Sequence, residues 1–192
     1  METKNVLLAG IGGQGTILAS KLLTEGLINE GYDVKMSEVH GMSQREGSVL
    51  THVRYGDHVY SPVVEELKGD VLIGFEQLEV LRNLNYLKED GLVVTSKQKV
   101  APIGVLTGEL EYPNNIEELI EDKVGELVVI DAMEEARKIG NTKVMNVILL
   151  GTIVKSMELE DIDWEQIIKD NVKEKFVDLN IKALKRGMSL VS

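Results

Sequence analysis

Short apolar runs alternate along the chain with longer segments in which apolar residues recur every three or four positions. The first run, residues 6–9, is too short for a helix and ends at Gly10, so it predicts a buried strand. From Thr16 onward the apolar residues follow helical spacing. A strand, a glycine-rich turn and a helix form the opening half of a βαβ unit, which predicts an α/β fold.

The same pattern divides the rest of the chain into further elements. Buried strands are expected over residues 33–37, 70–74, 91–95 and 126–130. Helices are expected over residues 15–29, 76–87, 116–120, 131–139, 144–157, 163–172 and 176–190. Asp131 is a predicted N-cap, and Asn141 or Thr142 starts the most apolar of these helices.

An antiparallel element is expected after the second strand. Residues 48–55 alternate between polar and apolar side chains, a turn signal follows, and residues 58–61 return, which predicts a hairpin. Val100 and residues 103–106 are interpreted as a short edge strand. We therefore expect a three-layer α/β/α fold with a Rossmann-like, mostly parallel sheet and an antiparallel hairpin. Residues 1–158 would form this domain, with residues 159–192 as a C-terminal helical extension packed on it.

The glycine-rich turn also has a chemical use. A tight turn needs a positive φ angle, and glycine adopts it at little cost. Backbone N–H groups at the start of the following helix would form a binding site for phosphate or another anion. The N–H groups concerned are those of Gly13, Gln14, Gly15 and Thr16. The alternative is that these glycines only pack the helix against the strand.

The spacing Gly10-x-Gly12-x-x-Gly15 also fits the fingerprint of dinucleotide-binding proteins, and Glu38 ends the second strand where an acidic ribose ligand would stand. A second helix should then begin, but residues 38–47 show neither helical nor strand periodicity. A long polar loop inside a compact α/β domain is unusual and is often functional.

Composition narrows the function classes. The 192 residues carry a net charge of −11, which argues against a nucleic-acid or anionic membrane surface. The chain contains no cysteine, which excludes disulfides, thiolate chemistry and cysteine-bound iron–sulfur clusters. No signal peptide is visible, and the longest apolar stretch is far short of the roughly 20 residues that span a bilayer. A cytoplasmic protein without membrane or nucleic-acid partners is expected.

Individual polar residues leave several possibilities open. The histidines lack tight metal-ligand spacing, so no metal site is expected; they are His40, His52 and His58. Arg45 and Arg54 are candidates to bind phosphate or carboxylate, or to form internal salt bridges with Glu38 or Glu46. A nucleophilic Ser43 or Ser48 would need a base and an oxyanion site, and the sequence identifies neither.

Two motifs together resemble a known family. The motifs are Gly10-Ile11-Gly12-Gly13-Gln14-Gly15, then Ser37-Glu38-Val39-His40-Gly41-Met42-Ser43-Gln44-Arg45-Glu46-Gly47-Ser48-Val49, with Thr51-His52-Val53-Arg54 and Tyr60-Ser61-Pro62 after them. Together they resemble the gamma-type module of the 2-oxoacid:ferredoxin oxidoreductases. Within that family, residues 40–45 and the chain length are most similar to the beta subunit of indolepyruvate ferredoxin oxidoreductases. Asn146 and Gly151 also look like positions of this family.

The resemblance implies a subunit that is inactive alone. Enzymes of this family decarboxylate an aryl 2-oxoacid on thiamine diphosphate with Mg²⁺, pass electrons through [4Fe-4S] clusters to ferredoxin, and transfer the acyl group to coenzyme A. It implies that thiamine diphosphate and the clusters belong to a larger partner subunit. The gamma-type module would then cover the active site on the coenzyme A side.

Three hypotheses follow for the function of the chain. In the first, cofactor-binding residues and active-site edge residues contact the shared site of a complex, with His40 and Arg45 as catalytic candidates. The cofactor-binding candidates are Gly10, Gly12, Gly13, Gln14, Gly15, Ser43, Gln44 and Arg45. The second is a free-standing NAD-dependent dehydrogenase with Glu38 on the ribose. The third is a pure scaffold in which the glycines serve packing only.

Overall fold

The computed structural model describes residues 1–41 and 47–191 of the chain. Within them, six strands form a single sheet in the order β2-β3-β1-β4-β5-β6. The strands are β1 (Lys4–Ile11), β2 (Asp33–His40), β3 (Ser48–Gly56), β4 (Gly69–Gly74), β5 (Leu87–Ser96) and β6 (Glu126–Ile130). Only β3 runs against the others, because it pairs antiparallel with β1 and β2 while β1, β4, β5 and β6 are mutually parallel.

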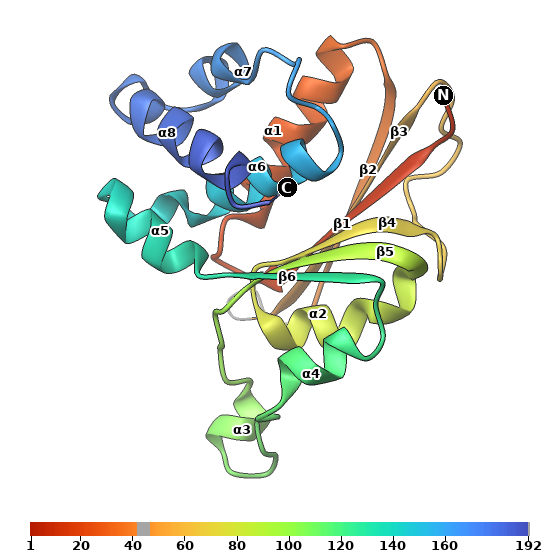
Figure 1. Ribbon diagram of the computed structural model, residues 1–192, viewed down its shortest axis with the longest axis vertical. Coiled ribbons are helices and arrows are strands. Elements are labelled where there is room, and N and C mark those ends of the chain that lie inside the picture. The colour runs from red at the N-terminus through yellow and green to blue at the C-terminus, as the bar shows by residue number, and fades with distance from the viewer. Residues whose placement is uncertain (42–46, 192) are drawn as a thin grey trace.

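Helices cover both faces of this sheet (Figure 1). The α-helices are α1 (Thr16–Asn29), α2 (Gln77–Asn83), α3 (Ile103–Leu106), α4 (Ile116–Glu121), α5 (Ala132–Ile139), α6 (Met145–Ser156), α7 (Trp164–Asn171) and α8 (Val177–Met188). Short 3-10 turns are η1 (Leu84–Tyr86), η2 (Thr142–Val144) and η3 (Glu174–Phe176). Within the described residues, no helix is both long and apolar enough to cross a membrane.

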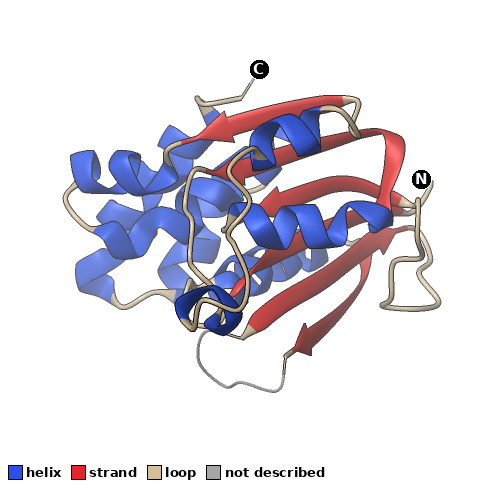
Figure 2. Cartoon of the chain, turned by 90° about the horizontal axis from the view of Figure 1, so that it is seen from below, coloured by secondary structure: helices blue, strands red, loops and turns tan. Residues whose placement is uncertain are grey.

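Two apolar cores fix the three layers. Alternate residues of β1 point to opposite faces, so Val6 and Leu8 join a core with α1, α5, α6, α7 and α8, whereas Leu7 and Ala9 join a second core with α2 and α4. Figure 2 shows the sheet between these helix layers. The predicted three-layer α/β/α fold with a mostly parallel sheet is therefore confirmed.

The antiparallel part of the sheet differs from the prediction. Residues 58–61 are not a strand; instead β3 pairs antiparallel with both β1 and β2. The physical reason is that both edges of β3 are already occupied, by β1 and by β2, which leaves no free edge for a returning strand. The side chain of Asp33 instead accepts a hydrogen bond from the backbone N–H of Val59, at 2.8 Å.

Three other local predictions also need correction. Residues 103–106 form the short helix α3 and not an edge strand, because Leu106 N and Thr107 N donate to the carbonyls of Pro102 and Ile103. Residues 38–40 belong to β2, so this strand extends three residues past its expected end at residue 37. The helix expected over 76–87 ends at Asn83, and η1 leads into β5.

Helix α8 lies against α6 at unusually close range. A Cβ atom on Gly151 would lie 2.3 Å from the carbonyl oxygen of Leu184, and one on Gly187 would lie 2.0 Å from that of Ile148. Only glycine therefore allows α6 and α8 to approach this closely. Trp164 and Leu184 join the same apolar core as α1. The division of the chain at residue 158 stays a prediction.

Candidate functional site

The sheet has a topological switch between β1 and β4, which are parallel neighbours. After β1 the chain continues into α1 on one face, and after β4 it continues into α2 on the other. In open α/β sheets, ligands bind outside the carboxyl ends of the strands at such a point. The glycine loop, residues 10–15, lies at this position.

The backbone of the glycine loop requires glycine at two positions. Gly13 and Gly15 have φ angles of +97° and +83°, a left-handed conformation that disfavours other residues. The N–H of Gly12 donates to the carbonyl oxygen of Gly47 at 2.9 Å, which joins the loop to the start of β3. Gly13 is exposed, so its backbone is open to another molecule.

Gln14 holds the loop together from inside. Its Oε1 accepts a hydrogen bond from Ile11 N at 2.7 Å, and its Nε2 donates to the carbonyl oxygen of Phe75 and to Gln98 Oε1, each at 3.2 Å. These bonds connect the segments that follow β1, β4 and β5. Because its amide already has these protein partners, Gln14 orients the loop backbone in this structure.

A second helix N-terminus meets the loop. Asn146, at the start of α6, donates from Nδ2 to the carbonyl oxygen of Gly15 at 3.2 Å. Beside this contact is a cavity of about 360 Å³, lined by Gly13, Gln14, Gly15, Gln98, Met133, Thr142, Lys143 and Met145. The N-termini of α1 and α6 therefore approach one cavity.

The electrostatics of this cavity favour an anion. Helix N-termini carry partial positive charge and N–H groups without partners inside the helix. Among the described residues, no side chain caps the N-terminus of α1, and no acidic residue occupies its first turn. Lys143 adds a full positive charge at the cavity wall, and its side chain forms no ion pair with a described carboxylate. A phosphate group fits this set of donors.

His40 lies at the same end of the sheet as the glycine loop but two strands away. Val49 of β3 pairs with Gly10 on one side and with His40 on the other. Strand spacing places these two backbones about 10 Å apart. His40 Nε2 is 2.8 Å from Glu38 Oε1, and its side chain is exposed. Its catalytic role stays a prediction, and the other loop candidates, Ser43, Gln44 and Arg45, lie outside the described residues.

The sheet order disfavours the dinucleotide interpretation. In a Rossmann fold the strand bearing the acidic residue neighbours the first strand. Here β3 lies between β1 and β2, and the register Leu8–Thr51–Glu38 places Glu38 two strands from β1. The carboxylate of Glu38 instead faces His40. The glycine spacing alone was therefore a misleading signal.

The other predicted polar residues have structural partners. His52 is buried, accepts a hydrogen bond at Nδ1 from Val64 N, and packs edge-on against Tyr86; burial lowers the pKa of His52, so its ring is neutral. Arg54 donates to Asn5 Oδ1 and to the carbonyl oxygens of Ser61 and Val63.

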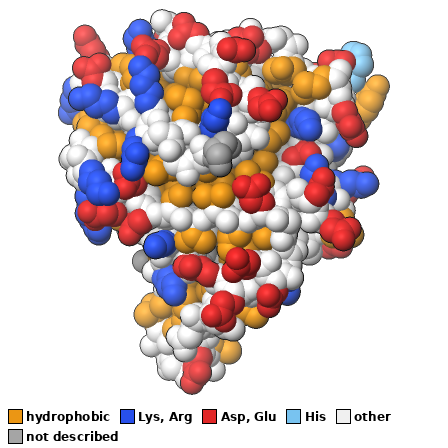
Figure 3. All heavy atoms as spheres, viewed as in Figure 1, with side chains coloured by type: hydrophobic (Ala, Val, Ile, Leu, Met, Phe, Trp, Pro, Cys, Tyr) orange, Lys and Arg blue, Asp and Glu red, His pale blue; other side chains and the backbone are white. Residues whose placement is uncertain are grey.

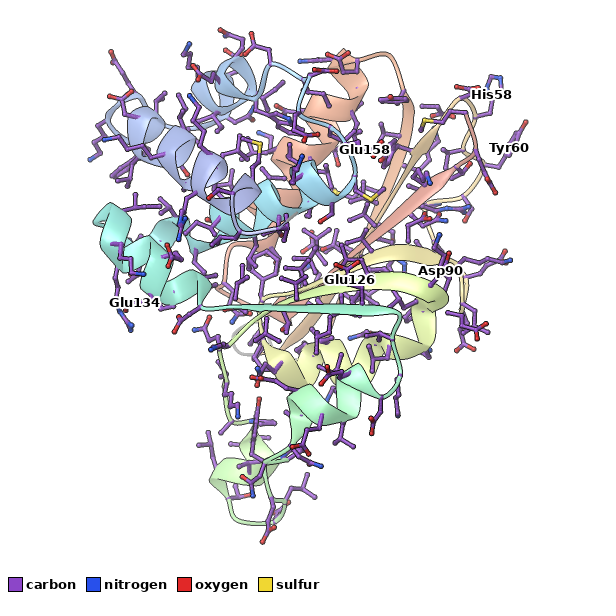
Figure 4. The ribbon with its side chains drawn as sticks, in the orientation of Figure 1. His58, Tyr60, Asp90, Glu126, Glu134 and Glu158 are labelled. Carbon is purple, nitrogen blue, oxygen red and sulfur yellow. The ribbon has the colours of Figure 1, made fainter. Side chains whose placement is uncertain are left out.

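The third histidine is far from the glycine loop. His58 and Tyr60 point outward from the loop that follows β3, whereas Glu134 marks α5 on the opposite side of the molecule (Figure 4). Within the described residues, no group of three potential metal ligands comes together. The histidines thus give no sign of a shared site.

Sequence reasoning missed two sets of residues at this edge. Lys143, Thr142 and Gln98 line the cavity although they are distant from residue 13 in sequence, and no local pattern marks them. A buried polar network was also missed. In it, Ser48 Oγ donates to Glu79, which also pairs with Arg82, and Tyr112 donates to the buried Glu76.

Comparison with known proteins identifies the family. The sequence model described as pyruvate ferredoxin/flavodoxin oxidoreductase matches residues 5–190. The chain belongs to this family. The resemblance that the two sequence motifs indicated is thereby confirmed.

Several curated relatives are similar over nearly their whole length. The indolepyruvate oxidoreductase subunit IorB of Pyrococcus horikoshii is 39% identical over 193 residues, covering 98% of this chain and 96% of that protein. The subunit of the same name from Archaeoglobus fulgidus is 37% identical, covering 95% and 92%. These relatives are subunits of oxidoreductases, which supports an oxidoreductase subunit over a free-standing dehydrogenase.

Longer relatives contain this unit as a part. The ketoisovalerate oxidoreductase subunit VorA of Methanothermobacter marburgensis is 25% identical over 189 residues, and the match covers 35% of that protein. Among solved structures, the gamma subunit of a keto/oxoacid ferredoxin oxidoreductase from Geobacter sulfurreducens has a TM-score of 0.74, with 22% identity and coverage of 99% and 97%. The latter likeness supports the fold.

Proposed function

We propose that this chain is the smaller subunit of an indolepyruvate (aryl 2-oxoacid):ferredoxin oxidoreductase. The observation that carries the proposal is the match to the Pyrococcus horikoshii subunit, which extends over 96% of that protein and 98% of this chain. The complex would convert a 2-oxoacid to an acyl-coenzyme A and pass two electrons to ferredoxin, which is its acceptor.

The two subunits would divide the chemistry between them. This chain has no cysteine, so it offers no thiolate for an iron–sulfur cluster. A larger partner subunit would hold the [4Fe-4S] clusters and thiamine diphosphate with its Mg²⁺. The smaller subunit would contribute a binding surface that completes the active site, and it would be inactive alone.

The proposed contribution of this chain is an anion site for coenzyme A, the co-substrate. Coenzyme A carries phosphate groups, and the cavity between α1 and α6 offers helix N-termini and Lys143 as partners for one of them. Gly13 and Gly15 would supply backbone N–H groups, with Gln14 keeping their orientation through Phe75 and Gln98. Ser43, Gln44 and Arg45, which follow His40 in the sequence, would also contact the ligand.

Steady-state kinetics of the complete complex test this site. Lys143→Ala and Arg45→Ala should each raise the KM for coenzyme A by about tenfold, since each removes one charge-assisted contact to phosphate. The KM for the 2-oxoacid should remain unchanged, because that substrate reacts on the larger subunit. Lys169→Ala provides a matched control, because this lysine is exposed on α7 and its substitution removes the same charge at a different place.

Two results would contradict the proposal at different levels. Unchanged coenzyme A dependence in both variants would refute the anion site while leaving the subunit assignment intact. Failure of the wild-type chain to support 2-oxoacid oxidation with a larger iron–sulfur subunit would refute the assignment itself. Co-purification of that brown subunit in equal amount from the native source is the simplest supporting observation.

A further inference from the structure

One segment projects away from both helix layers. Residues 99–113 leave the sheet after β5, form α3 at their far end and return to α4. We call this segment the finger. Figure 1 shows α3 at the lower extremity of the molecule, beyond α2 and α4. The finger adds little to either apolar core, so its shape needs another explanation.

The tip of the finger is apolar and exposed. Ile103, Leu106 and Leu110 are 76%, 66% and 64% exposed. Leu110 N donates to the carbonyl oxygen of Gly104 at 2.9 Å, which holds Leu110 against α3 and gathers the three side chains at one end. Figure 3 shows apolar side chains at the lower tip of the surface. Clustered exposed apolar side chains of this kind mark interaction sites.

The finger is anchored at its base rather than loosely attached. Both of its arms reach the same buried carboxylate: Val100 N donates to Glu76 Oε1 at 3.1 Å, and Tyr112 Oη donates to the same oxygen. Glu76 is fully buried and caps α2 through Glu79 N. An apolar tip on a fixed base loses little conformational entropy when it binds.

We propose that the finger inserts its apolar tip into an apolar pocket, rimmed by basic side chains, on the larger subunit of the complex. This inference rests on the proposed function. Charge supports the stated chemistry, because the exposed Glu109 and Glu111 flank the tip. Opposite charge around an apolar contact steers association and fixes its orientation.

The position of the finger also indicates that the larger subunit is its binding partner. Gln98, which precedes its first residue, bonds to Gln14 of the glycine loop at 3.2 Å. The finger thus begins at the anion site that the larger subunit would complete. In the longer VorA relative, moreover, the segment matching this chain is covalently joined to additional polypeptide, since it covers 35% of that protein. A surface committed to contact with such a polypeptide is therefore expected on the separate chain.

A second copy of the chain is the main alternative occupant. A cavity of about 840 Å³ near the start of β5 combines an apolar wall with three cations; its lining includes Leu67, Leu81, Leu84, Leu87, Arg82, Lys88 and Lys123. Two of these cations already have partners, since Arg82 pairs with Glu79 at 2.6 Å and Lys88 with Asp70 at 2.9 Å. Because these two cations are already paired within the chain, they offer little free charge to the acidic tip of a second copy. The larger subunit is therefore favoured as the partner.

The test measures assembly directly. The full chain and the larger subunit are purified, and their dissociation constant is measured by biolayer interferometry. The double variant Ile103→Ser/Leu106→Ser should raise this constant by at least about tenfold, because both side chains would be buried at the contact. The thermal unfolding midpoint of the variant chain should stay within about 2 °C of wild type, because both side chains are exposed in the free chain.

Two further variants separate apolar from electrostatic contributions. Tyr60→Ser removes a side chain that is 94% exposed in a different loop, and it should leave assembly unchanged. Glu109→Lys/Glu111→Lys should weaken assembly mainly at low ionic strength, because salt screens exposed charges. A loss that appears equally at high salt would contradict the basic rim.

The remaining outcomes overturn the inference in distinct ways. If the wild-type chain binds the larger subunit and Ile103→Ser/Leu106→Ser binds equally well, the finger is not the contact. If the free chain forms a dimer that this double variant abolishes, the occupant is a second copy. If the wild-type chain does not bind the larger subunit at all, the proposed function is wrong and this inference fails with it.

Discussion

Asn146 of α6 donates a hydrogen bond from Nδ2 to the carbonyl oxygen of Gly15, 3.2 Å away, although 131 positions separate them in sequence. The bond joins the N-terminus of the most apolar helix to the turn after the first strand. Asn146 is 4% exposed, so its side chain has little room to move. The geometry of the glycine loop therefore depends on α6 as well as on the glycines themselves.

Substitution of the two left-handed glycines should separate backbone strain from packing. Gly13→Ala places its Cβ in open space, so we expect only the strain of a left-handed residue, a loss of about 1 kcal/mol in unfolding free energy. Gly15→Ala places its Cβ 2.6 Å from Asn146 Nδ2 and should cost about 1–3 kcal/mol more. Urea denaturation of both variants checks this difference.

A double variant provides the internal control for that difference. Asn146→Ala removes the side chain that the new Cβ meets, so Gly15→Ala should be less damaging in its presence. Equal losses for Gly13→Ala and Gly15→Ala would show that α6 does not constrain the loop.

The crossing of α6 and α8 should tolerate replacement of neither of its two glycines. Gly151→Ala and Gly187→Ala place a Cβ at 2.3 Å and 2.0 Å from backbone oxygens, which cannot rotate away. Each should lower the unfolding free energy by about 3 kcal/mol, and this exceeds the gain of up to about 1 kcal/mol from removing glycine from a helix. Lys182→Ala, on the exposed side of α8, should change it by less than about 0.5 kcal/mol. Tolerance of either alanine would contradict the observed approach of the helices.

Stability at acidic pH should depend on Glu135. Arg186 and then Lys138 lower the pKa of Glu135 to about 2, from 4.5. A carboxylate with a lowered pKa contributes stability above its unfolded pKa, and that contribution is lost as the pH falls from about 4.5 to about 2. We expect about 1 kcal/mol, because the side chains of Lys138 and Arg186 are 60% and 42% exposed and water screens the pairs.

Comparison with Glu135→Gln separates the contribution of Glu135 to stability from that of the other carboxylates. The variant should be less stable than wild type at pH 7, and the two stability curves should converge as the pH approaches about 2. A constant difference across that range would mean that the ion pairs contribute nothing to stability.

The base of the finger should loosen when Tyr112 loses its hydroxyl. Burial and the neighbouring Glu76 raise the pKa of Tyr112, so the hydroxyl stays protonated and donates to the buried carboxylate. Tyr112→Phe leaves Glu76 without this donor and should cost about 1–3 kcal/mol. Amide hydrogen exchange should accelerate in residues 99–113 more than in α8. Tyr60→Phe, at an exposed position, should alter neither quantity.

Part of the candidate site could be predicted from local sequence. The turn after the first strand needs positive φ angles, and the four glycines over residues 10–15 predict such a turn from the sequence alone. Lys143 and Gln98 carry no such mark, because their place at the cavity results from the packing of α6 and β5 beside the loop. The finger was also misread, since a four-residue apolar segment fits a strand or a helix equally well.

The sequence by itself determined the succession of strands and helices, because hydrophobic periodicity and glycine conformations are local properties of the chain. It also determined that no thiolate ligand for an iron–sulfur cluster is available here. Tertiary structure alone decided that β3 lies between β1 and β2, which moves Glu38 away from the glycine loop. Strand order depends on which edges remain free once other pairs have formed, and that is a property of the whole sheet.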